Sequence, residues 1–194
     1  MTLGGYDAFE DPYAYKGTNV LKNRAGLRDA RLLEAFELEM TALRADEALP
    51  AGRFGPAHYR AVHRHIFQDV YSWAGRYRTV RTSKDGNAFC YPEHIDVSMR
   101  KLFDRLRSPP FTGGADLDAF IQGAADFLAD LNAIHPFRDG NGRCQLSFLH
   151  LVALRAGHPL NLHKVRRTTI IPAMIASFAG DSRLLKDELA KLGG

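Results

Sequence analysis

The apolar pattern of segment 117–134 constrains the fold of this chain more than any other feature. Its apolar residues recur at the three- and four-residue spacing of one helix face, at Phe120, Ile121, Ala124, Phe127, Leu128 and Leu131. Such a face is stable only when it is buried against other elements. We therefore expect a helix here, with its apolar stripe in the core.

Helical spacing recurs in most of the remaining chain. It predicts further helices over 24–44, 56–73, 92–106, 146–154, 168–178 and 182–192. Pro56 and Pro92 suit the first turn of a helix, while Gly75 and Gly157 suit the residue after one. The predicted fold class is therefore all-α, apart from one segment.

Residues 77–91 break the helical pattern. Tyr77 and Val80 favour extended backbone, 83–87 (Ser-Lys-Asp-Gly-Asn) is turn chemistry, and 89–91 can return as a strand. We expect a β-hairpin over this segment.

Composition indicates one globular domain. The chain has 194 residues, of which 45% are hydrophobic and 25% charged. Without a repeat or linker, we expect a single domain over 1–194. No apolar run reaches the roughly 20 residues of a membrane span, and the N-terminus lacks the apolar region of a secretory signal. Cys90 and Cys144 are too few for a disulfide scaffold, so the expected location is a reducing cytoplasm, away from membranes.

The charge balance is mildly basic. Lys and Arg number 26 against 22 Asp and Glu, a net charge of +4. This surplus suits a polyphosphate or an acidic partner, but no basic recognition helix stands out, so we expect no direct nucleic-acid binding. The cluster of Arg76, Arg78, Arg81 and Lys84 is expected to form a solvated hairpin edge.

Two other groups of reactive side chains have ordinary explanations. His58, His63 and His65 lack the His-Glu-x-x-His spacing of a zinc helix, so we expect surface or half-buried histidines. Cys144 follows Arg143, and a basic neighbour can lower a thiol pKa, but no partner for nucleophilic catalysis is evident. We expect Cys144 to fill space in the core.

The segment 135–143, His-Pro-Phe-Arg-Asp-Gly-Asn-Gly-Arg, combines groups that suit phosphate chemistry. His135 ends a predicted helix, and an imidazole can accept a hydroxyl proton at neutral pH. Asp139 supplies a hard carboxylate that could hold Mg²⁺ between phosphates. Alone, His135 would be an ordinary helix cap and Asp139 an ordinary turn residue. Their combination favours a functional site.

The residues that follow favour an anion. Gly140 and Gly142, on either side of Asn141, let backbone N–H groups approach a phosphate where the next helix begins with the positive end of its dipole. Arg143 adds a planar cation for the same anion. The Gly-Lys-Ser/Thr ending of a Walker loop is absent, so the pattern indicates a phosphate-transfer site of another kind.

This segment resembles the signature of the Fic family, His-Pro-Phe-x-Asp/Glu-Gly-Asn-Gly-Arg, at every position. The resemblance extends to segments 11–13, 21–23, 69–75, 78–80 and 83–86 and to Phe89. It implies a mainly helical Fic fold with one β-hairpin flap over the active site. The parts that the resemblance implies are an N-terminal arm over 1–23, a catalytic core over 55–180 and the flap over 77–91.

The resemblance implies a protein adenylyltransferase, which moves AMP from ATP to a Ser, Thr or Tyr hydroxyl of a target protein and releases pyrophosphate. His135 would take the hydroxyl proton, and Asp139 would hold Mg²⁺. The nucleotide phosphates would be bound by Gly140, Asn141, Gly142 and Arg143. The target would be clamped by addition of a strand at the flap residues Lys84, Asp85, Gly86 and Asn87. By family analogy the target is a GTPase or a type II topoisomerase.

One position departs from the family pattern. Fic motifs commonly carry a second Arg three residues after the first, which holds the γ-phosphate and receives an inhibitory Glu, and this chain has Leu146 there. We expect adenylylation with altered ATP anchoring. The alternatives are transfer of phosphocholine or of phosphate, or a catalytically weak binding module. The related Doc phosphotransferases carry Lys where this chain has Gly142, and unaltered His135 and Asp139 argue against a silent module.

The family's inhibitory helix has the pattern Ser/Thr-x-x-x-Glu-Gly/Asn. No Ser or Thr of this sequence has Glu four residues later. We therefore expect a separate small antitoxin to supply this helix, which would make the chain the toxin of a bacterial toxin–antitoxin pair.

Overall fold

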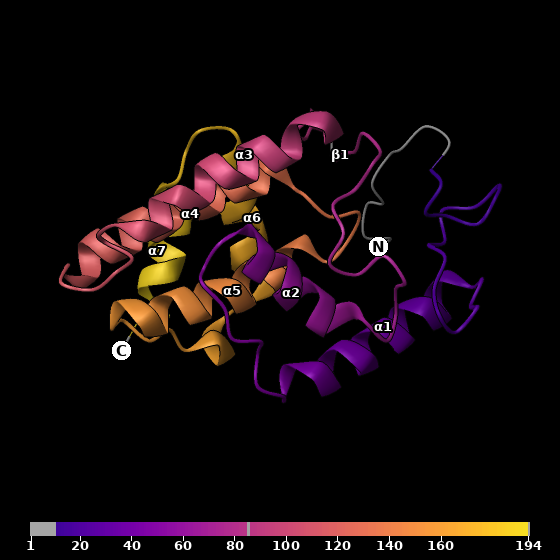
Figure 1. Cartoon of the computed structure of the whole chain (residues 1–194), viewed down its shortest axis with the longest axis horizontal. Helices are drawn as coiled ribbons and strands as arrows, with labels where there is room; N and C mark the ends of the chain where they lie inside the picture. Colours follow the sequence, from indigo (N-terminus) through magenta and orange to yellow (C-terminus); the bar gives the residue numbers. More distant parts are fainter. Residues whose placement is uncertain (1–10, 85, 194) are drawn as a thin grey trace.

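The computed structural model describes residues 11–84 and 86–193. Its helices are α1 (Ala30–Ala45), α2 (Pro56–Phe67), α3 (Pro92–Asp104), α4 (Leu117–Ile134), α5 (Asn141–Ala156), α6 (Arg167–Phe178) and α7 (Arg183–Ala190), with 3₁₀ turns η1 (Arg105–Arg107) and η2 (Leu162–Lys164). The strands are β1 (Ser83–Lys84) and β2 (Asn87–Ala88). This arrangement confirms the predicted helical fold with one hairpin (Figure 1). None of the described helices is long and apolar enough to cross a bilayer.

Helix α4 is central to the core. Asp116 caps its start, accepting a hydrogen bond from the Ala119 backbone N–H at 2.8 Å. The predicted apolar stripe is buried, including Phe120, Phe127 and Leu131. Helices α3, α5, α6 and α7 all pack against α4, and Figure 1 shows α3 alongside it. The core therefore holds the end of α4, and the residue that follows it, in a fixed place.

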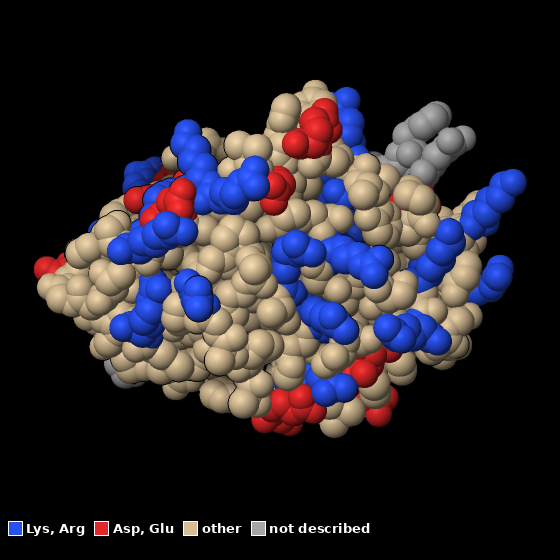
Figure 2. All heavy atoms as spheres, in the orientation of Figure 1, with Lys and Arg blue, Asp and Glu red and all other residues tan. Residues whose placement is uncertain are grey.

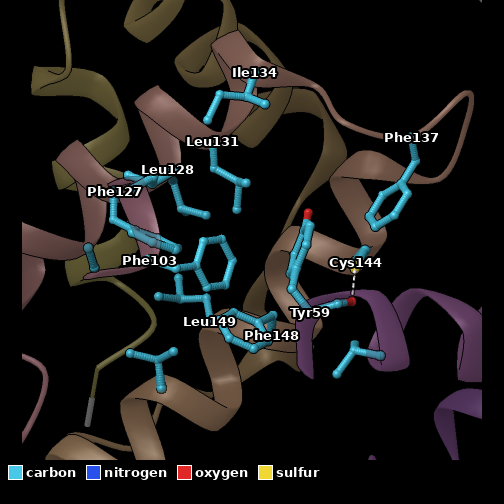
Figure 3. Close-up of a cluster of buried hydrophobic side chains, with 14 of the residues drawn as sticks. Tyr59, Phe103, Phe127, Leu128, Leu131, Ile134, Phe137, Cys144, Phe148 and Leu149 are labelled. Carbon is cyan, nitrogen blue, oxygen red and sulfur yellow. Dashed lines mark hydrogen bonds between the residues drawn. The ribbon is translucent and has the colours of Figure 1, made fainter. Parts of the chain in front are cut away.

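Aromatic side chains fill the space between α2, α3, α4 and α5 (Figure 3). Tyr59 stacks on Phe137 with ring centroids 5.4 Å apart and meets Phe148 edge-on at 5.3 Å. The Cys144 thiol donates to the Tyr59 carbonyl at 3.6 Å, and burial raises the pKa of that thiol. Cys144 is therefore a filler of the core, as predicted. Because Phe137 belongs to the loop after α4, this packing also anchors that loop.

Helix α2 is shorter than predicted. It ends at Phe67, and residues 68–75 turn back towards it instead of continuing the helix. Gly75 has φ +79°, and a Cβ there would lie 2.8 Å from a backbone oxygen of α2, so only glycine fits. The turn is held because the Gly75 N–H donates to Nδ1 of His63 at 3.0 Å.

Two of the three histidines on α2 are buried, so the expectation of surface or half-buried positions is wrong for them. His58 and His63 are 6% and 0% exposed, whereas His65 is half-buried. His58 accepts a hydrogen bond from the Phe54 N–H at 3.2 Å and donates to the Pro50 carbonyl at 2.7 Å. Burial is tolerated because backbone groups satisfy both ring nitrogens.

His63 connects α2 to the loop after α4. Since Nδ1 accepts from Gly75, the ring proton lies on Nε2, which donates to the Asp139 carbonyl at 2.9 Å. The ring also packs on Phe137, with centroids 3.7 Å apart. Burial lowers the pKa of His63 to about 3, so the imidazole is neutral in the folded protein at neutral pH.

The hairpin is much shorter than the predicted 77–91. Only Ser83 and Lys84 pair with Ala88 and Asn87. The buried Arg78 explains the difference, because its guanidinium donates to the carbonyls of Val80 and Cys90, which a longer hairpin would use in its ladder. Arg78 is only 2% exposed, so its predicted place on a solvated edge is wrong.

The described part of the N-terminal arm packs against the body of the protein. Tyr13 meets Trp73 edge-on at 5.6 Å, and its hydroxyl accepts from the Thr79 N–H at 3.1 Å. Asp11 forms a buried ion pair with Arg138, with Asp11 Oδ2 2.6 Å from Arg138 Nη2. The arm therefore touches both the flap segment and the loop after α4.

Acidification should destabilise the fold through His63. Its pKa falls from about 6.5 in the unfolded chain to about 3 in the folded protein, so its contribution is complete above pH 6.5 and is lost as the pH falls towards 3. At pH 5 this linkage costs about 2 kcal/mol relative to pH 8. Urea unfolding at both pH values should show that His63→Gln is less stable at pH 8 but loses about 2 kcal/mol less on acidification.

The matched control is His94→Gln, which changes an exposed histidine on α3. Its loss of stability between pH 8 and pH 5 should equal that of the native chain. An equal loss in His63→Gln would contradict the assignment.

Candidate active site

The loop between α4 and α5 begins at His135, which has a left-handed backbone. Its φ is +48°, a conformation that is uncommon for any residue except glycine. Arg78 holds it there, because Nε donates to the His135 carbonyl at 2.8 Å and Nη2 donates to the Ile134 carbonyl at 3.2 Å. The end of α4 is therefore fixed by a cation from the flap segment.

The His135 imidazole is buried and neutral. Its residue is 6% exposed, and burial, reinforced by the charge of Arg78, lowers the pKa to about 3, while a hydrogen bond with the Asn132 backbone opposes that shift. Phe89 stacks on the ring, with centroids 3.9 Å apart and planes 13° apart. A neutral imidazole can accept a proton, so the ring is in the form that a general base requires.

Asn141, the first residue of α5, closes the loop on itself. Its side-chain oxygen accepts from the Phe137 N–H at 3.0 Å, and its amide donates to the Phe137 carbonyl at 2.9 Å. The residue is fully buried. The Asn141 side chain is thus a brace of the loop, and its predicted contact with a phosphate stays a prediction.

The two glycines of the loop meet different surroundings. Gly140 has φ +77°, and a Cβ there would lie 2.3 Å from the Phe67 ring, so the fold itself requires glycine. Gly142 lies in the first turn of α5, is exposed, and a Cβ there would meet no described atom within 4 Å. The fold therefore does not require glycine at this position. The open space beside Gly142 leaves room for a ligand to approach the start of α5.

The Asp139 carboxylate lies where a cation would stabilise it. The residue is half-buried, and its Oδ1 accepts from the Gly140 N–H at 2.5 Å. Burial, followed by the nearby charge of Glu37, raises the pKa of Asp139, and the charge of Arg143 opposes this effect. A bound cation would offset both causes of the raised pKa, because its charge stabilises the carboxylate form of Asp139.

Arg143 extends from the first turn of α5 to a site built by α1 and α2. Its Nη2 lies 2.5 Å from Oε1 of Glu37, and its Nη1 donates to Oγ1 of Thr41 at 3.3 Å. The guanidinium lies over the Phe67 ring, 4.5 Å from the centroid. Leu146, one turn later on α5, is half-buried and supplies no second cation.

The described flap residues lie next to the loop. Phe89, which contacts His135, also donates its N–H to the Thr82 carbonyl at 3.1 Å and so ties the end of the hairpin to its start. Lys84 is half-buried, whereas Gly86 and Asn87 are exposed, and Asp85 lies outside the described residues. The role of these residues in target docking stays a prediction.

A basic hollow lies beside the end of α2 and the turn that follows it. It has a volume of about 400 Å³, and its lining includes Arg24, Arg64 and Arg76 but no residue of the 135–143 loop. On the face of the molecule seen in Figure 1, Lys and Arg side chains lie in groups scattered from one end to the other (Figure 2). The basic surplus is therefore not confined to the loop and the hairpin.

The residues of the site that the sequence does not predict include Glu37, His63 and Arg78. Glu37 contacts Arg143 in the first turn of α5, whereas His63 and Arg78 contact the loop before it. Arg78 lies in a segment resembling the family, which was its only signal. Glu37 stands in an ordinary amphipathic helix, where charged residues usually face solvent.

The chain is similar to known proteins over most of its length. The model of the Fic/DOC family matches residues 53–153. A relative in Sinorhizobium fredii, a probable protein adenylyltransferase named y4lH, is 48% identical over 188 residues, covering 96% of this chain and 98% of the relative. The probable protein adenylyltransferase Fic of Escherichia coli is 32% identical, covering 94% of this chain and 92% of the relative. The protein adenylyltransferase VbhT of Bartonella schoenbuchensis is 33% identical, and only 38% of its length is covered, against 93% of this chain.

Solved structures extend the similarity beyond the family model. BepC of Bartonella tribocorum, with bound AMPPNP, superposes with a TM-score of 0.84 at 25% identity, covering 94% of this chain and 96% of that one. An N-terminal Fic domain from Bartonella quintana, with bound ADP, superposes with a TM-score of 0.83 at 26% identity, covering 94% of this chain and 94% of that one. Together with the signature at 135–143, these matches show that the chain belongs to the Fic/DOC family.

Proposed function

We propose that this protein transfers AMP from ATP to a hydroxyl group of a target protein. The observation that carries the proposal is the loop between α4 and α5. It begins with a neutral imidazole, and it leads into an open helix start whose first turn carries a partly exposed guanidinium. Two kinds of comparison support it, namely relatives named protein adenylyltransferase and structural neighbours that hold AMPPNP and ADP.

The start of α5 would bind the phosphates. The first backbone N–H groups of a helix have no partner within it, and the helix dipole adds positive potential there. The open space beside Gly142 lets an α-phosphate reach these groups, and Arg143 would hold the phosphate chain. Gly140 would contribute to phosphate binding through its backbone, because the turn at this position, which only glycine can adopt, leads into the start of α5.

His135 would act as the general base. The target oxygen attacks the α-phosphorus and its proton passes to the imidazole, while the bond between α-phosphorus and the bridging oxygen breaks and pyrophosphate leaves with the electron pair. Charge on the α-phosphate increases in this step, and the fixed N–H groups of the helix start would stabilise it. The braces from Asn141, His63 and Arg78 keep these groups in place.

The donor set at Asp139 fits Mg²⁺. This half-buried carboxylate has a raised pKa, and no group of three His, Cys, Asp or Glu side chains gathers within residues 11–84 and 86–193. Mg²⁺ is commonly held by one or two carboxylates together with substrate phosphates and waters. When bound, the ion would neutralise charge on the phosphates. Asp139 would hold it there.

The target segment would pair with the exposed edge of the hairpin. The described flap residues Lys84, Gly86 and Asn87 precede Phe89, which stacks on His135, so a strand added there would run close to the imidazole. A GTPase and a type II topoisomerase are the proposed classes of target. We further propose a small antitoxin as the partner that silences a toxin in the bacterial cytoplasm, because no Ser or Thr of the chain begins the inhibitory pattern.

Leu146 favours one alternative, in which the donor is a different nucleotide-linked molecule such as one carrying phosphocholine. The half-buried Leu146 offers no charge for a γ-phosphate, so the end of a triphosphate would be held less firmly. The mass of the group found on a modified target distinguishes AMP from phosphocholine.

The first test is label transfer from α-³²P-ATP in a bacterial lysate. The native chain should label a target protein, and His135→Ala should reduce the rate by roughly 10²- to 10⁴-fold because no base remains. Label transfer that survives His135→Ala would overturn the mechanism. A phosphocholine adduct in mass spectrometry would replace the AMP proposal with the alternative.

Gly142→Ala tests where the nucleotide lies. Outside the backbone of its own helix, a methyl group at this position meets no described atom within 4 Å, and alanine is the better helix former, so stability should be unchanged or higher by up to about 1 kcal/mol. The rate of AMP transfer should nevertheless fall by roughly tenfold or more, because the methyl group displaces the phosphate. Unfolding curves and label transfer measure the two effects.

Gly140→Ala provides the contrast, because its Cβ would clash with Phe67. This variant should lose stability as well as activity. Full activity in a stably folded Gly142→Ala would place the phosphates away from the start of α5.

A further inference from the structure

Arg143 is held from α1, a helix that lies outside the 53–153 segment matched by the family model. Glu37 and Thr41 are four residues apart on α1 and therefore lie on one face of it. Oε1 of Glu37 accepts a hydrogen bond from Nη2 of Arg143 at 2.5 Å, and Oγ1 of Thr41 accepts one from Nη1 at 3.3 Å. Two neighbouring side chains thus bind both terminal nitrogens of one guanidinium.

Glu37 is itself fixed in place. Its other carboxylate oxygen accepts a hydrogen bond from the Tyr71 hydroxyl, and its side chain is only 15% exposed. Burial, reinforced by the charge of Glu37, raises the pKa of Tyr71, so this hydroxyl remains a donor. Thr41 is 5% exposed, and its hydroxyl donates a hydrogen bond to the Glu37 backbone carbonyl at 2.8 Å. Because the hydroxyl proton is used there, the lone pairs of Oγ1 can accept from Arg143.

The remaining side of Arg143 is available to a ligand. Phe67 covers one face of the guanidinium at 4.5 Å, yet the Arg143 side chain is 41% exposed. Within residues 11–84 and 86–193, no acceptor takes a hydrogen bond from its Nε. The guanidinium therefore has one anchored edge and one free donor.

We infer that Glu37 is a positioning residue that presents Arg143 to the phosphates of the nucleotide. This inference rests on the proposed function, since it assigns Arg143 a phosphate ligand. A free arginine loses rotamer entropy when it binds an anion, and a side chain ordered beforehand avoids that loss. The effect matters more here because Leu146 supplies no second arginine to share the phosphates.

Glu37 acts by hydrogen bonding and not by attracting the ligand. Its carboxylate repels phosphates, but both of its oxygens are engaged, by Arg143 and Tyr71, and face away from solvent. A glutamine at this position would keep one oxygen for Arg143. It would lose the charge, and its amide N–H groups would replace the oxygen that accepts from Tyr71, whose hydroxyl can itself accept a hydrogen bond. Alanine would remove the anchor. The two substitutions therefore separate positioning from charge.

The experiment measures the dissociation constant of AMPPNP with Mg²⁺ by isothermal titration calorimetry. Glu37→Ala should raise it about tenfold, as expected for the loss of a hydrogen bond to a charged group. Glu37→Gln should stay within about threefold of the native value. In label transfer from ATP, Glu37→Ala should raise KM with little change in kcat, because Arg143 binds the phosphates before and during the reaction.

Glu39→Ala is the matched control, since it removes an exposed carboxylate from the same helix and should bind AMPPNP like the native chain. Tyr71→Phe is a milder variant that frees one oxygen of Glu37, and it should raise the dissociation constant about threefold.

Native-like or tighter AMPPNP binding by Glu37→Ala, or equal weakening by Ala and Gln, would overturn the inference. If Glu37→Ala does not fold, native-like binding by Tyr71→Phe would overturn it instead. Failure of the native chain to bind AMPPNP would contradict the proposed function, which keeps the two failures apart.

Discussion

The site depends on the hydrogen bonds that brace the loop between α4 and α5. Asn141 binds both backbone groups of Phe137, while His63 binds the Asp139 carbonyl from α2. The Phe137 ring is buried among the aromatic side chains of the core, so the loop has little freedom to move. This rigidity allows His135 and the start of α5 to stand at fixed positions. In a reaction governed by positioning and electrostatic stabilisation, such order is worth more than any single contact.

Charged side chains from other parts of the chain surround this loop. Arg78, from the flap segment, donates hydrogen bonds to the carbonyls at the end of α4, and Asp11, from the arm, forms an ion pair with Arg138. Helix α1 contributes Glu37, which anchors Arg143 and adds its charge to the burial that raises the pKa of Asp139. The site thus contains a carboxylate, Asp139, whose pKa is raised and two imidazoles, His63 and His135, whose pKa values are lowered. A nucleotide with a divalent cation would stabilise the charged form of this carboxylate and would require no change in the protonation of either imidazole.

The loop and most helices could be predicted from the sequence, because their signals are local. The apolar stripe of α4 and the contiguous signature at 135–143 need no knowledge of distant contacts. The hairpin was overpredicted because Arg78, buried by tertiary packing, takes carbonyls that local propensity assigns to a ladder. Glu37 and Arg143 are separated by 106 residues, and the pattern of α1 alone does not distinguish a solvated glutamate from one that holds an arginine. The family model, which begins at residue 53, does not cover Glu37 either.

The most direct test of this account is a crystal structure of the protein with AMPPNP and Mg²⁺. We expect the α-phosphate within hydrogen-bond distance of the backbone N–H groups at the start of α5. We also expect the cation on Asp139, and Arg143 on the phosphates while Glu37 still binds the other edge of its guanidinium. Phosphates bound in the basic hollow formed by Arg24, Arg64 and Arg76, with the loop left empty, would contradict it.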